Sequence, residues 1–492
     1  MQLSYAPSFA DRKSADVLIL PFWQGEKKAT PACPMDSFAA GFEAAVKSGD
    51  FFGKEGELLP IYKKSNKEER LLLLGLGEKE ACDPERIRRS IAAAVKWCRS
   101  KKIPTVSIAL PRTDFPAAVP VTEGFLMTSF VFDSLRPHTV KKDPPVAISR
   151  CCLIGIGEEV FDDCKRAEVI INAVNFSRGL IMGNADDVTP EHLADVAKSL
   201  AKDYSSVKTT ILDKKKIEQE KMGLLLAVNR GSALEPRFIL VEYRGNPSGD
   251  DLTALVGKGI TYDTGGLNIK PGSGMITMKD DMSGGATVLG VIKAAAELKL
   301  KVNILAAIPS TENAIGSRSY KLGDVYKSHS GKTVEIIDTD AEGRLVLADA
   351  LSYVQKHYKP KRIIDLATLT GGIIVALGEE VAGLFSNDDK LSKALGEAGK
   401  ATYERLWRFP LYTEYKEVLK SPIADMKNAG DRKASSISGA IFIQEFVEKK
   451  VPWAHLDIAG VAFLSNPRHY HSTPATGFGV RLLVEFLSAL EK

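Results

Sequence analysis

The chain has 492 residues, of which 44% are hydrophobic and 26% are charged, and its formal net charge is only +4. This ordinary globular composition provides enough apolar material for two or three domains. The near balance of acids and bases gives no reason to expect nucleic acid as the main partner, because a binding face would need clustered basic residues.

The N-terminal residues and the apolar runs indicate the compartment. Asp11, Arg12 and Lys13 interrupt the stretch in which a secretory signal needs an unbroken apolar segment. No apolar run reaches the ~20 residues of a membrane-spanning helix. We therefore expect a soluble, cytoplasmic protein without a membrane partner.

The cysteines are expected to be reduced and partly buried. They form no C-x-x-C pair, so neither a disulfide framework nor a zinc knuckle is predicted. The six are Cys33, Cys82, Cys98, Cys151, Cys152 and Cys164.

Residues 1–155 alternate strand-like and helix-like segments, which predicts a small N-terminal α/β domain. The segment 83–102 is expected to be a helix, because Asp83 can cap it, Pro84 suits its first position and apolar residues recur at helical spacing. Buried strands are predicted at 15–22, 70–77 and 105–111.

The segment 158–181 has helical periodicity, so residues 156–185 are predicted to contain a connecting helix. Residues 186–492 are expected to form a larger α/β domain with a central, largely parallel sheet flanked by helices. Its candidate strands are 239–243, 253–260, 302–309, 333–338, 362–369 and 454–463. Sites in such sheets gather at the carboxyl ends of the strands.

Two segments, 255–285 and 336–351, concentrate ionisable groups among glycines. In an extended segment alternate residues face one way, so Asp340 and Glu342 can point into one pocket. Buried neighbouring carboxylates are costly unless positive charge lies between them. An oxygen-rich cluster without cysteine or a nearby histidine suits divalent metals.

Other common active-site patterns do not fit. A phosphate-binding loop would need glycine where the chain has Leu252, and there is no H-E-x-x-H zinc motif. No G-x-S-x-G nucleophile motif occurs either.

Seven segments of the C-terminal part resemble the signature motifs of the leucine aminopeptidase family, also called the cytosol aminopeptidases. They follow one another in the family's order and cover nearly all of that part. They are VGKGITYDTGGLNIKP (256–271), MKDDMSGGA (278–286), DTDAEGRLVLADAL (338–351), DLATLTGG (365–372), ADMKNAG (424–430), WAHLDIAGVA (453–462) and ATGFGVRLL (475–483).

The resemblance implies a metal-dependent aminopeptidase that releases N-terminal amino acids, leucine and similar ones preferred, through a metal-bridging water. It implies a homohexamer and two divalent ions per subunit, Mn²⁺ or Zn²⁺ and alternatively Mg²⁺. Asp263 and Glu342 would share the metals, Asp340 would bind one of them, and Lys258, as a neutral amine, and Asp281 would bind the other. The acid directly before the methionine is the family's ligand, which selects Asp281 over Asp280.

Other roles also follow from the resemblance alone. Lys270 would stabilise the developing oxyanion, and Arg344 would hold a bicarbonate-like anion. Met278, Leu369 and Gly371 would contact the peptide, although Met278 is equally well explained as a core residue and the other two as turn residues.

The sequence departs from the family's pattern at Asp338, where the family usually has asparagine. The added charge could change metal preference. His455 is expected to be a core histidine and not a ligand. Two alternative functions stay open at this point: phosphoester hydrolysis on the same metals, and DNA binding as an accessory function.

Overall fold

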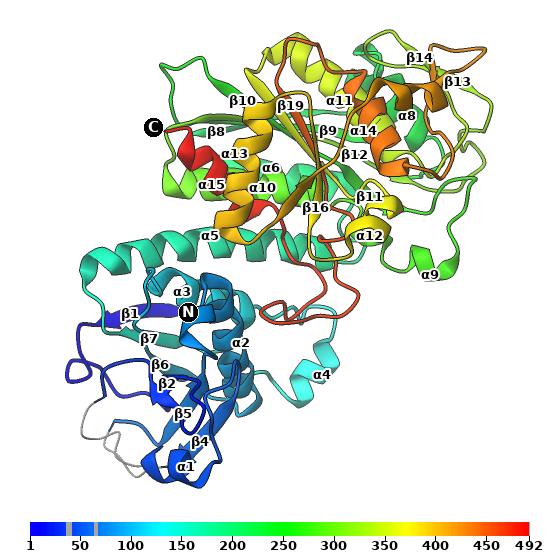
Figure 1. The fold of residues 1–492 in the computed structure, drawn as a ribbon. Coiled ribbons are helices and arrows are strands. Elements are labelled where there is room, and N and C mark those ends of the chain that lie inside the picture. The colour runs from blue at the N-terminus through cyan, green and yellow to red at the C-terminus, as the bar shows by residue number, and fades with distance from the viewer. Residues whose placement is uncertain (36–41, 63–66, 492) are drawn as a thin grey trace. The chain divides into compact units, whose positions relative to one another are not determined.

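The computed structural model describes residues 1–35, 42–62 and 67–491, which form two compact units (Figure 1). Unit 1 contains residues 1–172 and 466–473, and unit 2 contains residues 173–465 and 474–492. Helix α5 (Glu158–Met182) contributes to both units and lies within residues 156–185, where a connecting helix is predicted. The domain boundaries at 155 and 185 stay a prediction.

Unit 1 is built on a mostly parallel seven-stranded sheet with the order β1-β7-β6-β2-β5-β4, and β3 pairs with β2. The strands are β1 (Gln2–Ala6), β2 (Val17–Trp23), β3 (Thr30–Pro31), β4 (Leu58–Tyr62), β5 (Arg70–Gly75), β6 (Thr105–Ala109) and β7 (Arg150–Ile154). Its other helices are α1 (Phe42–Ser48), α2 (Pro84–Ser100), α3 (Ala118–Ser129) and α4 (Pro137–Lys142), with a 3₁₀ turn, η2 (Lys79–Ala81).

Helix α2 forms as its sequence predicts. The Asp83 side chain caps it by accepting a hydrogen bond of 2.8 Å from the backbone N–H of Arg86, and Pro84 is its first residue. Ile87 and Ile91 are buried on the face that packs within the unit. All six cysteines are free and five of them are buried, in agreement with the sequence.

Unit 2 is built on a nine-stranded sheet with the order β17-β16-β19-β15-β10-β12-β9-β8, and β11 pairs with β12. The four central strands β19, β15, β10 and β12 are parallel, and antiparallel pairs occur towards the edges. The strands are β8 (Val207–Leu212), β9 (Arg237–Arg244), β10 (Leu252–Gly257), β11 (Gly259–Asp263), β12 (Asn303–Asn313), β15 (Arg362–Ala367), β16 (Ala382–Ser386), β17 (Leu406–Arg408) and β19 (Trp453–Asp457).

Helices cover both faces of this sheet (Figure 1). Helices α8, α11 and α14 pack on one face around a large apolar core, and α10 and α15 pack on the other. The helices of unit 2 are α6 (Pro190–Asp203), α7 (Lys214–Gln219), α8 (Gly223–Asn229), α9 (Gly272–Met275), α10 (Ser283–Leu298), α11 (Gly343–Tyr358), α12 (Gly371–Leu377), α13 (Asp389–Thr402), α14 (Ser435–Gln444) and α15 (Val480–Ala489), with 3₁₀ turns η3 (Met278–Asp280) and η4 (Thr413–Leu419).

The predicted fold class is confirmed: a small N-terminal α/β unit precedes a larger α/β unit with a largely parallel central sheet. Three strand predictions are wrong in detail. Of the segment 454–463, only the residues up to Asp457 belong to a strand, β19. Residues 253–260 form two strands, β10 and β11, interrupted at Lys258, and the segment 333–338 lies outside the main sheet. Its residues Thr333–Glu335 form β14, which pairs with β13 (Val325–Lys327) and β18 (Met426–Lys427) in a small separate sheet.

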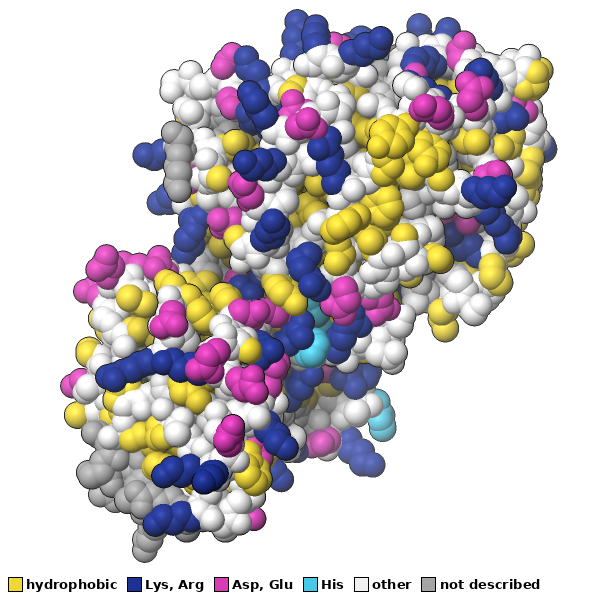
Figure 2. All heavy atoms as spheres, viewed as in Figure 1, with side chains coloured by type: hydrophobic (Ala, Val, Ile, Leu, Met, Phe, Trp, Pro, Cys, Tyr) yellow, Lys and Arg dark blue, Asp and Glu magenta, His cyan; other side chains and the backbone are white. Residues whose placement is uncertain are grey.

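Within the described residues, no helix is both long and apolar enough to cross a membrane. Figure 2 shows basic and acidic side chains intermixed over the visible face of the molecule. Acidic and basic side chains therefore lie near one another on this face, as their similar numbers in the sequence would suggest.

Candidate active site

The ionisable residues gather at the carboxyl ends of the central strands of unit 2. Lys258 follows β10 directly, Asp263 is the last residue of β11, and Thr368 follows β15. Gly257 allows the end of β10 to pack backbone to backbone on the start of α10, because a Cβ at this position would lie 2.5 Å from the carbonyl oxygen of Gly284. This edge of a parallel sheet is where ligand sites are expected.

Lys258 is buried between two acids. Its Nζ lies 2.7 Å from Asp281 Oδ1 and 2.8 Å from Glu342 Oε1, and it donates a hydrogen bond of 2.9 Å to the carbonyl oxygen of Thr368. Lys258 is 2% exposed, and both acids are buried as well. The contact joins the β10–β11 break to the start of α10 and the start of α11.

Lys270 joins the other two acids. Its Nζ lies 2.9 Å from Asp263 Oδ2 and 2.7 Å from Asp340 Oδ1. Asp263 also accepts hydrogen bonds from the backbone N–H of Gly265 (2.9 Å) and from Asn313 Nδ2 (2.7 Å). Asp263, Asp340 and Glu342 each place one carboxylate oxygen within 4.8 Å of the other two.

The cluster carries an excess of negative charge. Four carboxylates and two ammonium groups leave a formal charge of −2 when all are ionised. Burial, with the carboxylates of Glu342 and Asp263 adding to it, raises the pKa of Asp340 to about 7. Burial alone would lower the pKa of Lys258, but the carboxylates of Asp281 and Glu342 outweigh it and hold this pKa above its ordinary value.

A cavity of about 620 Å³ opens onto these groups. Arg344 reaches it from the first turn of α11 and donates a hydrogen bond of 3.0 Å from Nη1 to the carbonyl oxygen of Asn428. The predicted substrate residues Met278, Leu369 and Gly371 all line the same cavity. Every candidate site residue from the sequence therefore lies at or around this single cavity.

The donor set fits divalent metal ions. Asp281 Oδ2 and Glu342 Oε2 are buried and have no hydrogen-bond partner among the described residues. Unpaired buried carboxylate oxygens are costly unless a cation or a proton satisfies them. Carboxylate oxygens with one amine nitrogen suit Mn²⁺, Zn²⁺ or Mg²⁺ better than soft metals.

Several supporting residues were not identified from the sequence. Thr368 donates a hydrogen bond of 2.8 Å from Oγ1 to Asp281 Oδ1, and Asn313 holds Asp263. Asn428 positions Arg344 through its carbonyl oxygen. Thr368 and Asn428 lie inside two of the quoted motifs, so their presence there was the available signal, whereas Asn313 lies in none of them.

His455 is confirmed as a core histidine. It is completely buried on β19, and its Nδ1 lies 2.5 Å from Asp365 Oδ1. Asp365 also accepts a hydrogen bond of 2.7 Å from Trp453 Nε1. These three residues form a buried polar group, and none of them lines the cavity.

Comparisons with known proteins place the chain among similar sequences and structures. A family model described as "Cytosol aminopeptidase family, catalytic domain" matches residues 175–484, and the corresponding N-terminal domain model matches residues 19–139. The chain is 48% identical over 494 residues to a protein of Protochlamydia amoebophila (strain UWE25) named "Probable cytosol aminopeptidase", covering 100% of this chain and 99% of that protein.

Two solved structures show the same fold. One is a mutant of tomato leucine aminopeptidase, with 33% identity and a TM-score of 0.88 over 99% of this chain and 96% of that one. The other is the bottromycin maturation enzyme BotP in complex with Mn, with 29% identity and a TM-score of 0.86 over 97% of this chain and 100% of that one.

Proposed function

The chain belongs to the cytosol aminopeptidase family, and we propose that it releases N-terminal amino acids from peptides, with leucine and similar residues preferred. Family membership makes it a metal-dependent aminopeptidase, which is a hydrolase. The observation that carries the finer proposal is the convergence of four carboxylates and two lysines on one cavity.

We propose that this cluster holds two divalent ions per subunit. Asp263 and Glu342 would be shared, Asp340 would complete one position, and Lys258 and Asp281 would complete the other. Lys258 would have to lose the proton that its pairing with Asp281 and Glu342 now favours, because only the neutral amine can bind a metal. When bound, the ions would lower the pKa of an attacking water that bridges them and polarise the scissile carbonyl. Manganese is supported by the Mn complex of BotP, with zinc and magnesium as the alternatives.

The residues around the ions would position and stabilise the substrate. Lys270 stays charged beside Asp263 and Asp340, so its ammonium group can stabilise the negative charge that develops on the carbonyl oxygen. Arg344 can hold a bicarbonate-like anion that moves a proton, because its side chain lines the cavity and its buried Nε has no hydrogen-bond partner among the described residues.

The proposed preference for leucine-like side chains rests on the cavity's apolar wall. Met278, Leu369, Ile374 and Phe463 line the cavity that contains the charged cluster. Such a wall suits an aliphatic side chain, and the backbone at Leu369 and Gly371 can hold the peptide.

Assembly and location are also proposals. The names of the relatives support a cytoplasmic location. A homohexamer would cover apolar side chains that are exposed on unit 2, among them Val375 (90%), Tyr412 (65%), Ile423 (64%) and Trp407 (63%). Sedimentation analysis giving a monomer at micromolar concentration would contradict the hexamer.

The test combines metal analysis with the cleavage of leucine anilides. Glu342→Ala and Asp281→Asn should each lose at least one ion per chain and about 100-fold or more in kcat/KM, because each removes a metal-binding oxygen. Asp280→Asn is the matched control, since Asp280 is a buried neighbouring acid that is not assigned to a metal.

Three results would contradict the proposal. The first is Glu342→Ala with full metal content and activity. The second is Asp280→Asn losing metal while Asp281→Asn keeps it. The third is hydrolysis of phosphoesters but not of leucine anilides by the metal-loaded wild type, which would favour the alternative reaction on the same metals.

A further inference from the structure

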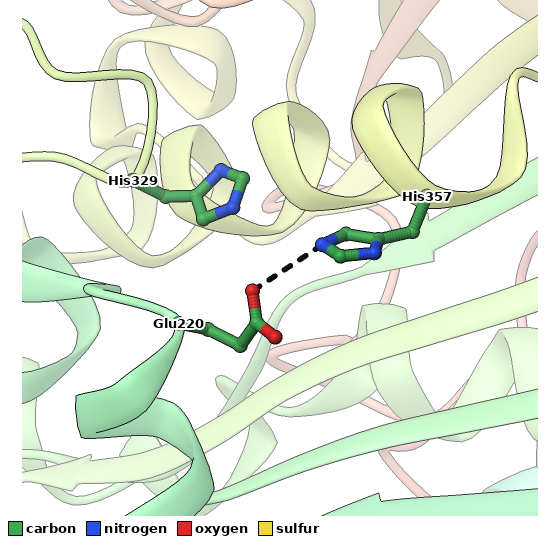
Figure 3. A group of neighbouring side chains, drawn as sticks. All are labelled: Glu220, His329 and His357. Carbon is green, nitrogen blue, oxygen red and sulfur yellow. Dashed lines mark ion pairs between the residues drawn. The ribbon is translucent and has the colours of Figure 1, made fainter.

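A second group of metal-binding side chains lies on unit 2, outside the catalytic cavity. Glu220, His329 and His357 each place one ligand atom within 4.8 Å of the others (Figure 3). None of the three lines the catalytic cavity. We propose that they form a third metal site of the chain, for a zinc-class divalent ion, that stabilises this side of unit 2.

The three side chains come from separate segments and face one another. Glu220 follows α7, His329 lies in the turn between β13 and β14, and His357 lies in the last turn of α11. His357 Nε2 is 3.3 Å from Glu220 Oε2, and Figure 3 shows the His329 ring turned towards this pair.

His329 has a nitrogen available for a ligand. Its Nδ1 lies 2.8 Å from Ser352 Oγ, while its Nε2 is buried and has no hydrogen-bond partner among the described residues. If Nδ1 donates to Ser352, the lone pair of Nε2 is free to bind a metal. Metal-binding histidines commonly use the second ring nitrogen in this way, which fixes the tautomer and the ring orientation.

The surrounding structure holds the other two segments to α11, which itself carries His357. Buried Asp349 of α11 accepts a hydrogen bond of 2.8 Å from the backbone N–H of His329. It also accepts hydrogen bonds from the backbone N–H groups of Leu224 and Leu225 (2.9 and 3.0 Å), close after Glu220. The ring of His357 stacks on Tyr353 at 4.2 Å between centroids. The ligands are therefore largely pre-positioned.

Two imidazoles and one carboxylate select for a particular class of ion. This donor set suits Zn²⁺, Co²⁺ or Ni²⁺, whereas Ca²⁺ and Mg²⁺ prefer oxygen ligands. Donors around tetrahedral zinc lie about 3.4 Å apart, so small side-chain rotations would bring these atoms into place. Burial, with the positive charge of Lys356 adding to it, lowers the pKa of His329 to about 4. His329 is therefore neutral at pH 7, as a ligand must be.

The third site is separate from the catalytic cluster. Glu342 immediately precedes α11 and His357 lies in its last turn, so the rise of the helix places them about 22 Å apart. An ion here would join α7, the β13–β14 turn and the end of α11. Because it binds the folded state alone, it should raise the unfolding temperature without changing the chemistry at the catalytic cluster.

The test uses the full-length enzyme, first loaded with Mn²⁺ and then given stoichiometric Zn²⁺. Crystals of the wild type should show an anomalous zinc peak between Glu220, His329 and His357. In solution, His357→Ala and Glu220→Gln should each bind one zinc ion fewer per chain than the wild type and lose the zinc-dependent rise in unfolding temperature. His192→Ala, which removes an exposed histidine of α6, is the matched control and should behave like the wild type.

This outcome is distinct from that of the proposed function, because His357→Ala should keep the aminopeptidase activity and the other ions. A missing zinc peak, or equal zinc content in the wild type and His357→Ala, would overturn the third site and leave the catalytic proposal untouched.

Discussion

Asp338 is a residue at which the sequence departs from the pattern of its family, and the structure shows what its carboxylate does. Asp338 Oδ1 accepts a hydrogen bond of 2.9 Å from the backbone N–H of Asp340, which closes the turn before the catalytic acids. Its backbone carbonyl oxygen accepts a hydrogen bond from Asn428 Nδ2. An asparagine could make both contacts, so the fold does not require the negative charge.

We predict that Asp338→Asn keeps the fold but weakens metal binding. The variant retains the turn's hydrogen bond, so its unfolding temperature without metal should match the wild type. It removes a negative charge from the wall of the metal cavity, so metal affinity should fall by roughly tenfold, which corresponds to about 1.4 kcal/mol. Titration with Mn²⁺ and with Zn²⁺ measures this change. Unchanged affinity for both ions would contradict the prediction, because it would show that the charge of Asp338 does not contribute to metal binding.

His455 makes the stability of the fold depend on pH. Burial would lower the pKa of His455, but the Asp365 carboxylate outweighs it and holds the pKa above its ordinary value of 6.5. Folding therefore favours the protonated ring. The resulting stabilisation is complete below pH 6.5 and is lost as the pH rises through the folded-state pKa.

The double variant His455→Gln/Asp365→Asn removes both the titrating imidazole and the carboxylate that raises its pKa. Between pH 6.5 and 9, the unfolding temperature of the metal-free wild type should fall more steeply than that of the double variant. His192→Gln, at an exposed position, should keep the wild-type slope. Parallel slopes for the wild type and the double variant would contradict the assignment.

At the scale of elements, α11 connects the catalytic cluster to the proposed third site. Glu342 and Arg344 lie at its start. In its middle, Asp349 accepts hydrogen bonds from three backbone N–H groups, two in α8 and one in the β13–β14 turn. Asp349 is completely buried. The helix is therefore tied to its neighbours by a polar contact as well as by its apolar face.

We predict that Asp349→Asn lowers the free energy of unfolding by about 2–4 kcal/mol. An amide offers one acceptor oxygen where the carboxylate offers two, so at least one buried N–H group loses its partner and faces another donor. Thermal unfolding of metal-free enzyme measures the loss. The control is Asp195→Asn, because the exposed ion pair between Asp195 and Lys198 contributes little to the free energy of unfolding. Equal stability of the two variants would be the contrary result.

Elements were predictable where the signal was local. The apolar run at 70–77 and the cap at Asp83 are short-range patterns, and both identified their elements. The segment 253–260 looks like one strand in the sequence because it is a nearly continuous run of small and apolar residues. The break at Lys258 depends on distant partners, Asp281, Glu342 and the carbonyl oxygen of Thr368. Pairing partners are also non-local, so the segment 333–338 could not be assigned to its small sheet.

The site was predictable for a different reason. Composition and spacing identified an acidic cluster and favoured divalent metals, but individual roles came from the resemblance to a family. Interactions between the motifs, such as the hydrogen bond from Thr368 Oγ1 to Asp281, could be identified only from the fold. The Glu220–His329–His357 group was invisible in the sequence because its members lie 28 or more positions apart in no recognisable motif.

At the scale of the whole molecule, the division into two units separates metal binding from the rest. All residues assigned to the catalytic metals and all three residues of the proposed third site belong to unit 2. Unit 1 has its own sheet and its own apolar core. Ions that bind folded unit 2 should therefore stabilise that unit selectively.

We predict that removing the metals lowers the unfolding temperature of unit 2 and leaves that of unit 1 in place. An ion present at 100 times its dissociation constant stabilises the folded state by about 2.7 kcal/mol, and two such ions have a correspondingly larger effect. Scanning calorimetry of the Mn²⁺-loaded and the chelated enzyme should show one transition moving to lower temperature and one staying fixed. In Glu342→Ala the moving transition should already lie low and respond little to chelator. If both transitions moved together in the wild type, metal binding would stabilise the chain as a whole and unit 1 would depend on the ions held by unit 2.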